Sequence, residues 1–189
     1  MSIKSVAVFC GSHKGKNPHF SEQAALLGHY LAAHELELVY GGSEDGLMGV
    51  VALATMKAGG RVYGVHPANL TESRMNPADI TELITVPDMD TRKRKMIERA
   101  DAFIVLPGGF GTLEELGQVI SWSKIDLQEK PTAFFNIDNF YDTLWAWLNE
   151  TIEAGFVPKS DLDLVYNGSS IEDIFGYFDA FKYPEQYKK

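Results

Sequence analysis

Several features that mark other protein classes are missing from this sequence of 189 residues. Cys10 is the only cysteine, so no internal disulfide can form, which agrees with a reducing compartment. No apolar run reaches the length of a membrane-spanning helix, and the first residues lead into a strand pattern without a signal-peptide pattern. We therefore expect a cytoplasmic protein with no membrane partner.

Positive charge is also scarce. The chain has 17 Lys and Arg against 26 Asp and Glu, which gives a formal net charge of -9 at pH 7. This balance argues against a nucleic-acid backbone as the main partner. A small phosphorylated ligand stays compatible with it where local cations offset the overall field.

Three sequence motifs that indicate a bound metal, dinucleotide or P-loop nucleotide are absent. The five histidines show no H-x-x-x-H spacing, so we expect no metal site. The first strand-to-helix turn lacks G-x-G-x-x-G, and no G-x-x-x-x-G-K-[ST] occurs anywhere. We therefore expect neither a NAD or FAD cofactor nor P-loop ATPase chemistry, and we predict no cofactor at all.

What the sequence does contain is a regular alternation of apolar runs and helical patterns. Apolar runs without strict alternation are typical of strands covered on both faces, and strands that alternate with helices indicate βαβ units. We predict a single α/β domain over residues 1–189, with a doubly wound, mostly parallel sheet of about seven strands and helices on both faces. The predicted strands are Ser5–Phe9, Leu36–Tyr40, Arg61–Val65, Leu83–Val86, Ala102–Leu106, Thr132–Asn136 and Asp163–Tyr166. The predicted helices are Pro18–Ala33, Gly46–Ala58, Thr91–Arg99, Thr112–Lys124, Tyr141–Glu153 and Ser170–Phe178.

In such a sheet a ligand binds at the carboxyl ends of the strands, where the strand order reverses. Glycine-containing turns follow the first, second and fifth predicted strands, at Cys10–His13, Gly41–Gly46 and Leu106–Glu115. We expect these turns to line the ligand crevice.

The turn after the fifth predicted strand is the most informative segment. Its three glycines fall between the apolar run and the helical pattern, where they let an anion approach the backbone closely. The first N–H groups of a helix lack intrahelical partners and favour negative charge. The turn therefore predicts a phosphate site, with Thr112 capping the helix and offering its hydroxyl.

Glu115 lies one helical turn beyond these glycines, where a site that only held phosphate would not need a carboxylate. It therefore predicts chemistry beside the phosphate. We interpret Glu114 as a solubilising acid near a helix N-terminus, and Glu44 and Asp45 as caps of the helix that begins near Gly46.

Four consecutive cations, Arg92 to Lys95, open the helix after the fourth predicted strand. A charge run is usually a solvated helix face. Helical spacing separates these cations, so Arg92 and Lys93 lie near the crevice while Arg94 and Lys95 can point elsewhere. Arg92 is the better candidate for contacting phosphate or a reacting oxygen, because its guanidinium is a permanently charged fork.

Other chemically capable side chains are interpreted structurally. We expect Cys10 to be a small buried residue rather than a nucleophile, and His13 to lie in a surface loop. We expect Trp122, Trp145 and Trp147 to pack in the core or at a subunit interface.

Taken together, these motifs resemble one known family. Pro107 to Glu115 fits PGGxGTxxE, Arg92-Lys93 fits its RK element, and Gly41-Gly42 with Gly46-Leu47-Met48-Gly49 fits its glycine turn. With Cys10-Gly11-Ser12 and Gly155-Phe156, the sequence resembles the LOG family of cytokinin riboside 5'-monophosphate phosphoribohydrolases, often mislabelled as lysine decarboxylases. The resemblance runs from about Val6 to Phe156.

This resemblance implies a Rossmann-like homodimer that cleaves the N-glycosidic bond of a purine nucleoside 5'-monophosphate. The products would be the free base and ribose 5-phosphate. By position, Arg92 and Glu115 would be the catalytic pair. The residues expected to bind phosphate or substrate are Gly11, Ser12, Gly42, Lys93, Gly108, Gly109, Phe110, Gly111, Thr112 and Ser121.

The sequence departs from the family pattern at five positions. Asp90-Thr91 replaces a His followed by a polar or acidic residue, Arg74 replaces a Glu, Ser43 replaces a Gly and His13 replaces a Ser. The catalytic pair is unaffected. Because of these departures the sequence does not identify the base of the substrate, so unmodified AMP or another purine monophosphate is as plausible as a cytokinin nucleotide.

Two other functions stay open at this point. One is a nucleotide-binding or carrier protein that uses the same crevice without catalysis. The other is a lysine decarboxylase, which ordinarily needs pyridoxal phosphate on a lysine, and for which the chain offers only Lys93 near a phosphate site.

Overall fold

The apolar segments expected to be strands pair into one sheet in which every pairing is parallel. The computed structural model describes residues 3–70 and 73–188. Within them the strands are β1 (Ser5–Phe9), β2 (Glu37–Tyr40), β3 (Arg61–Pro67), β4 (Glu82–Val86), β5 (Ala102–Val105), β6 (Thr132–Phe135) and β7 (Val165–Gly168). The predicted parallel sheet is confirmed.

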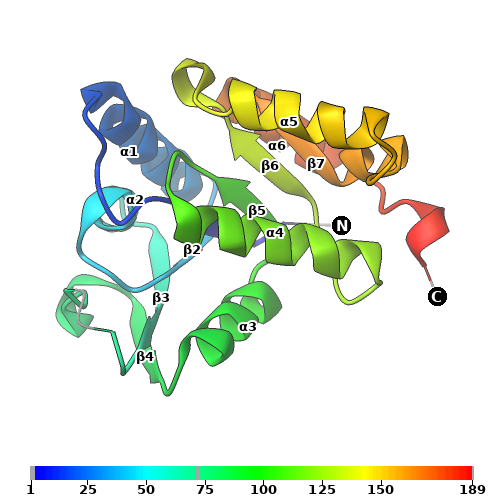
Figure 1. Ribbon diagram of the computed structural model, residues 1–189. Coiled ribbons are helices and arrows are strands. Elements are labelled where there is room, and N and C mark those ends of the chain that lie inside the picture. The colour runs from blue at the N-terminus through cyan, green and yellow to red at the C-terminus, as the bar shows by residue number, and fades with distance from the viewer. Residues whose placement is uncertain (1–2, 71–72, 189) are drawn as a thin grey trace.

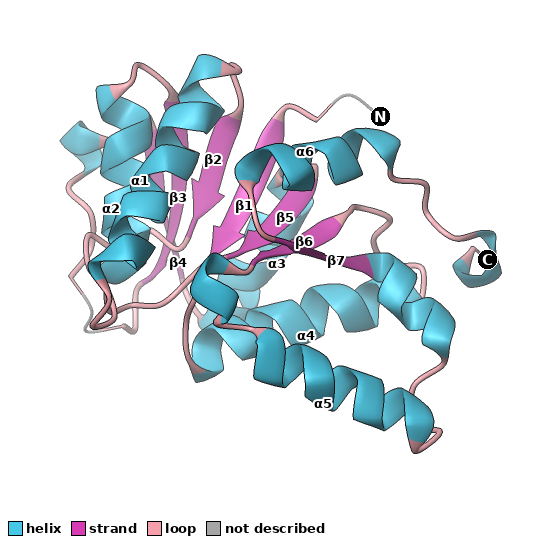
Figure 2. Ribbon diagram, turned by 90° about the horizontal axis from the view of Figure 1, so that it is seen from above, coloured by secondary structure: helices cyan, strands magenta, loops and turns pink. Residues whose placement is uncertain are grey.

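Helices cover both faces of this sheet, as Figure 2 shows from above. The helices are α1 (Pro18–Ala33), α2 (Gly46–Lys57), α3 (Met89–Arg99), α4 (Phe110–Lys124), α5 (Asp142–Glu153) and α6 (Ile171–Ala180). The helices α1, α2 and α6 pack on one face, and α3, α4 and α5 pack on the other. The doubly wound α/β fold is therefore confirmed.

The strand order is β4-β3-β2-β1-β5-β6-β7, which can be followed in Figure 1. The chain winds outward from β1 to β4 and then returns to place β5 beside β1, with Val8 opposite Ile104. The loops after β1 and β5 therefore leave neighbouring strands and diverge to opposite faces. A doubly wound sheet has its ligand crevice at this reversal.

The two strands at the reversal are buried along their whole length. All four residues of β5 have an exposed fraction of 0%, and all five residues of β1 are buried. The start of β1 is fixed by the carboxylate of Asp101, which accepts hydrogen bonds from the backbone N–H groups of Lys4 (2.9 Å) and Ser5 (3.0 Å). The loops that leave these strands thus start from a rigid platform.

Two predicted helix caps are wrong. The helix α4 begins at Phe110 with Gly109 at its N-cap, so Thr112 lies inside the first turn and does not cap it. Asp45 occupies the N-cap of α2, but its carboxylate makes no capping hydrogen bond. The Ser43 hydroxyl supplies the local bond instead, because it accepts from the backbone N–H of Asp45 at 3.1 Å.

Several other boundaries differ by one or two residues, and the local cause is evident for two of them. The helix α3 starts at Met89 rather than Thr91, because the Asp88 carboxylate caps it by accepting from the backbone N–H of Thr91 at 2.7 Å. The last strand starts at Val165 rather than Asp163, because Lys159–Leu164 forms a 3-10 helix.

Candidate active site

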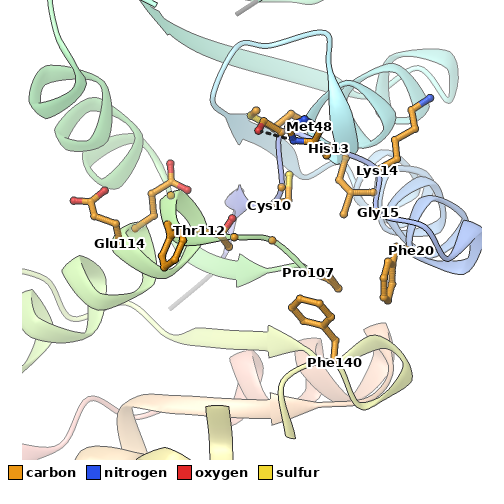
Figure 3. A pocket seen from close by; sticks show the side chains of 18 of the residues that line it. Cys10, His13, Lys14, Gly15, Phe20, Met48, Pro107, Thr112, Glu114 and Phe140 are labelled. Atoms are coloured by element: carbon orange, nitrogen blue, oxygen red, sulfur yellow. Dashed lines mark hydrogen bonds between the residues drawn. The ribbon is translucent and has the colours of Figure 1, made fainter. Parts of the chain in front are cut away.

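The loops after β1 and β5 are joined directly at the strand reversal. The backbone N–H of Gly11 donates to the carbonyl of Pro107 at 3.0 Å, and that of Leu106 donates to the carbonyl of Phe9 at 2.9 Å. A cavity of about 560 Å³ opens above this junction (Figure 3). The predicted site residues that line it are Gly11, Ser12, Arg92, Gly108, Gly109, Phe110, Gly111, Thr112 and Glu115.

The glycine turn places the start of α4 at this cavity. A Cβ atom on Gly108 would lie 2.1 Å from the Thr112 hydroxyl and 2.9 Å from the backbone nitrogen of Gly11, so only glycine fits there. The buried Thr112 side chain faces the cavity from the first turn of α4. The N–H groups of this turn lack intrahelical acceptors, which makes the turn suited to an anion.

Arg92 and Glu115 meet at one side of the same cavity. Arg92 extends from α3 and Glu115 from α4, and their exposed fractions are only 7% and 8%. The Nη1 atom of Arg92 lies 3.7 Å from Oε1 of Glu115. At this distance the two side chains form an ion pair, but they are too far apart for a direct hydrogen bond. A ligand atom can therefore approach both the guanidinium and the carboxylate.

The guanidinium of Arg92 is short of hydrogen-bond acceptors. Its Nη1 and Nη2 atoms lie near the sulfur atoms of Met89 (3.7 Å) and Met48 (3.9 Å), which are weak acceptors. Its buried Nε has no hydrogen-bond partner among the described residues. Because a buried donor without an acceptor is costly, this geometry suits a ligand that brings oxygen atoms to Arg92.

Lys93 turns away from the cavity that Arg92 lines. Its Nζ atom pairs with the carboxylates of Glu114 at 2.5 Å and Asp90 at 3.5 Å. Burial lowers the pKa of Lys93, but its bonds and charge interactions with Glu114 and Asp90 raise the pKa by more, so Lys93 stays charged. Arg94 and Lys95 are exposed, as expected.

Gly42 and Ser121 are also outside the cavity lining formed by the described residues. Gly42 lies in the turn after β2, where its carbonyl accepts from the backbone N–H of Met75 at 2.9 Å. Ser121 is exposed on α4. Substrate contacts by Gly42, Lys93 and Ser121 therefore stay predictions.

Of the five departures from the family pattern, only His13 lines the cavity. Arg74 donates to the Thr85 hydroxyl at 3.1 Å, and its backbone pairs with that of Ser43 in an isolated bridge. Asp90 belongs to the ion pair with Lys93. These contacts give Arg74, Ser43 and Asp90 structural roles outside the cavity.

The cavity lining also includes Cys10, from a turn that was expected to line the crevice, and several residues that were not predicted to lie there. Cys10 lines the same cavity as Arg92 and Glu115, and burial first and the charge of Glu115 second raise the pKa of its thiol. A protonated thiol is a poor nucleophile, which agrees with the structural role expected for Cys10. The lining residues that were not predicted include Lys14, Phe20, Met48, Leu70, Met89 and Phe140.

The described residues contain no group of three or more His, Cys, Asp or Glu side chains that could hold a metal ion. In the same part of the chain, every helix is too short or too polar to cross a membrane.

The chain is similar in sequence to known proteins of one family. A family profile described as "Possible lysine decarboxylase" matches residues 48–178. The cytokinin riboside 5'-monophosphate phosphoribohydrolase LOG5 of Arabidopsis thaliana is 37% identical over 180 residues, which cover 95% of this chain and 79% of that protein. The LOG2 enzyme of the same plant is 41% identical over 179 residues, which cover 95% and 84%.

A solved structure of the molybdenum cofactor binding protein from Rippkaea orientalis shares the fold. Its TM-score is 0.70 at 21% identity, and the match covers 95% of this chain and 98% of that one. At this identity the likeness concerns the fold alone. The profile, which matches more than half of the chain, and the curated relatives confirm the resemblance seen in the sequence motifs: this protein belongs to the LOG family.

Proposed function

We propose that this protein hydrolyses the N-glycosidic bond of a purine nucleoside 5'-monophosphate, of cytokinin type or AMP-like, to the free base and ribose 5-phosphate. The observation that carries the proposal is the buried Arg92–Glu115 pair beside a helix N-terminus suited to phosphate. The relatives named as phosphoribohydrolases support the same activity.

The phosphate is held first in this mechanism. The N–H groups at the start of α4, with the Thr112 hydroxyl, bind the 5'-phosphate, and Gly109 and Gly111 let it reach the backbone. A Cβ atom at either glycine would meet nothing within 4 Å, so the space beside them is free for a ligand. Binding energy at the phosphate then orients the bond that breaks.

Glu115 acts at the sugar, one turn further along α4. As the base leaves, positive charge builds on the ribose ring, and a carboxylate close to C1' stabilises this charge or takes a proton from the attacking water. The water oxygen bonds to C1', the C1'–N bond breaks, and the base nitrogen gains a proton. The acceptor-poor guanidinium of Arg92 holds phosphate or ribose oxygens in place.

We also propose a homodimer. Trp147 is 56% exposed on α5 and Phe110 is 94% exposed at the start of α4, and such apolar surface is covered in many assemblies. Trp122 and Trp145 instead pack against the core, which is one of the two places expected for the three tryptophans. A solution mass equal to one chain would rule out the dimer. The cytoplasmic location stays a prediction.

Product analysis tests the proposed activity. Purified protein should release free base from AMP or isopentenyladenosine monophosphate, but not from the unphosphorylated nucleosides. The matched control is Glu115→Gln, which keeps size and polarity but removes the carboxylate, and should retain nucleotide binding. Base release no faster than in this control would reject the activity for those substrates.

The same assay separates the enzyme from a non-catalytic carrier. A carrier would bind the nucleotide tightly in calorimetry and leave it intact after long incubation. Four of the five departures from the family pattern lie outside the cavity lining, so they do not favour a loss of catalysis.

The residues around the cavity do not fit pyridoxal phosphate, the cofactor of a lysine decarboxylase. Lys93 is bonded to Glu114, and the Lys14 side chain extends away from the glycine turn (Figure 3). Neither lysine is therefore placed for a Schiff base with a cofactor whose phosphate lies at the glycine turn. An aldimine absorbance in the visible range of the purified protein would contradict this conclusion.

A further inference from the structure

Two phenylalanines that the proposed reaction does not use form one end of the cavity. Phe20 belongs to α1, and Phe140 precedes α5. Their ring centroids are 5.7 Å apart at an interplanar angle of 80°, an edge-to-face pair. Both rings line the cavity, and Phe140 is 44% exposed. We call this pair the aromatic wall.

A carboxylate holds the aromatic wall together from behind. Asp138 accepts a hydrogen bond from Nδ2 of Asn17 at 2.7 Å and pairs with Nδ1 of His19 at 2.9 Å. These contacts tie the turn before α5 to the start of α1. They fix Phe140 against Phe20.

The turn that carries Phe140 has an unfavourable backbone. Asp138 and Asn139 are consecutive non-glycine residues in the left-handed region, with φ values of 52° and 61°. Such backbone persists only where surrounding contacts hold it, and it occurs often at ligand sites. The bonds of Asp138 to Asn17 and His19 are contacts of this kind.

The aromatic wall lies at the phosphate end of the cavity. In Figure 3, Phe20 and Phe140 face each other beyond Pro107, whereas Glu114 lies on the opposite side of Thr112. If the phosphate occupies the start of α4 and the ribose faces Glu115, as in the proposed function on which this inference rests, the wall lies behind the phosphate.

We propose that the aromatic wall is a specificity determinant, which admits nucleoside 5'-monophosphates and excludes nucleoside diphosphates. A second phosphate would meet two phenyl rings and Pro107, which has no N–H to donate. Burying a charge without a partner is strongly unfavourable. The carboxylate of Asp138 behind the rings adds repulsion.

Three cationic or titratable side chains nearby are not placed to pair with a second phosphate. His19 is engaged by Asp138 on one ring nitrogen and lies 2.9 Å from Nε2 of Gln23 on the other. The Lys14 side chain extends away from the rings, and His13 lies beside Ser12 at 3.4 Å (Figure 3). None of them faces the space behind the proposed phosphate.

Calorimetric titration with AMP and ADP tests the wall without requiring catalysis. The wild-type protein should bind AMP at least about tenfold more tightly than ADP, because the second phosphate is left without partners. Phe140→Ala should bind ADP more tightly and reduce this preference to about threefold or less. Phe140→Leu keeps an apolar side chain and should retain the preference. Phe156→Ala, an 82% exposed residue outside the cavity lining, is the matched control.

A second variant tests the support of the wall. Asp138→Gly relieves the left-handed backbone but removes the contacts to Asn17 and His19, so it should fold and still lose the preference for AMP. Asp138→Asn keeps an acceptor and tolerates the same backbone, so it should retain most of the preference.

The outcomes for the wall and for the proposed reaction are separable. If the wild type prefers AMP but releases no base from any monophosphate, the hydrolase proposal fails and the wall stands. If base is released but Phe140→Ala keeps the wild-type ratio of AMP to ADP affinity, the wall proposal is overturned. A wild type that binds ADP as tightly as AMP overturns it as well.

Discussion

A methyl group added to Gly41 would lie 1.7 Å from the Nη2 atom of Arg92. The turn after β2 therefore contributes to the site by leaving room for the guanidinium. We predict that Gly41→Ala displaces Arg92 and lowers kcat by about a hundredfold, the usual effect of misplacing a reacting group by an ångström. Steady-state kinetics of base release would measure it.

The matched control is Gly117→Ala on α4, where an added Cβ meets nothing within 4 Å. It should keep wild-type kcat and gain slight stability, because alanine favours helix over glycine. A Gly41→Ala enzyme with wild-type kcat would show that turnover does not depend on the position of the Arg92 guanidinium.

Substitutions of Gly108, before α4, and Gly111, in its first turn, should affect different properties. A Cβ atom on Gly111 has free space, so Gly111→Ala should leave the melting temperature unchanged or slightly higher. It should still raise KM by about tenfold or more, because the methyl group would occupy the path of the phosphate to the backbone. Gly108→Ala should instead lower the melting temperature as well, because its Cβ would clash with Thr112. Equal melting temperatures for the two variants would contradict this distinction.

The cap of α3 should give a pH-dependent contribution to stability. The backbone N–H of Thr91 is the main cause that lowers the pKa of Asp88 below its usual 3.8. Because the folded-state pKa is below the unfolded value, the stabilisation is fully present above about pH 3.8 and is lost as pH falls through the folded-state pKa. Asp88→Ala should therefore melt a few degrees lower at pH 7, and the two curves should converge in acid. A constant difference at all pH values would exclude this origin.

Tyr141 links the turn before α5 to the end of β5. Its buried hydroxyl donates to the carbonyl of Leu106 at 2.6 Å, and burial is the main cause that raises the pKa of this hydroxyl. Tyr141→Phe leaves that carbonyl without this donor, so it should lower the free energy of unfolding by about 1–2 kcal/mol. Urea denaturation at neutral pH would measure the change, and an unchanged midpoint would show that another donor replaces the hydroxyl.

The sheet and the position of the crevice were predictable because they follow from short-range patterns. β5 is a continuous apolar run because it is buried on both faces, and the glycines after it could only be a turn. β7 was placed two residues early because the preceding segment is held by a tertiary contact, the buried carboxylate of Asp161 pairing with Lys124 at 2.6 Å. No local pattern encodes that contact.

A site residue was predictable only where its own helix or turn determines which way the side chain points. Arg92 and Lys93 are adjacent and both cationic, but a step of about 100° along α3 turns Lys93 to Glu114 and leaves Arg92 at the cavity. The aromatic wall joins residues far apart in the chain. Its formation depends on Asp138 adopting a left-handed backbone, which the sequence pattern does not reveal.

The cavity draws on both helical layers of the fold. Arg92 and Glu115 belong to the layer of α3, α4 and α5, whereas Gly11 and Ser12 lead into α1 of the other layer. A nucleotide that contacts residues of both layers would link them across the edge of the sheet. Local unfolding of either layer would then require the ligand to leave first. Ligand binding should then slow amide hydrogen exchange in α1 and α4 together, although the two helices lie on opposite faces.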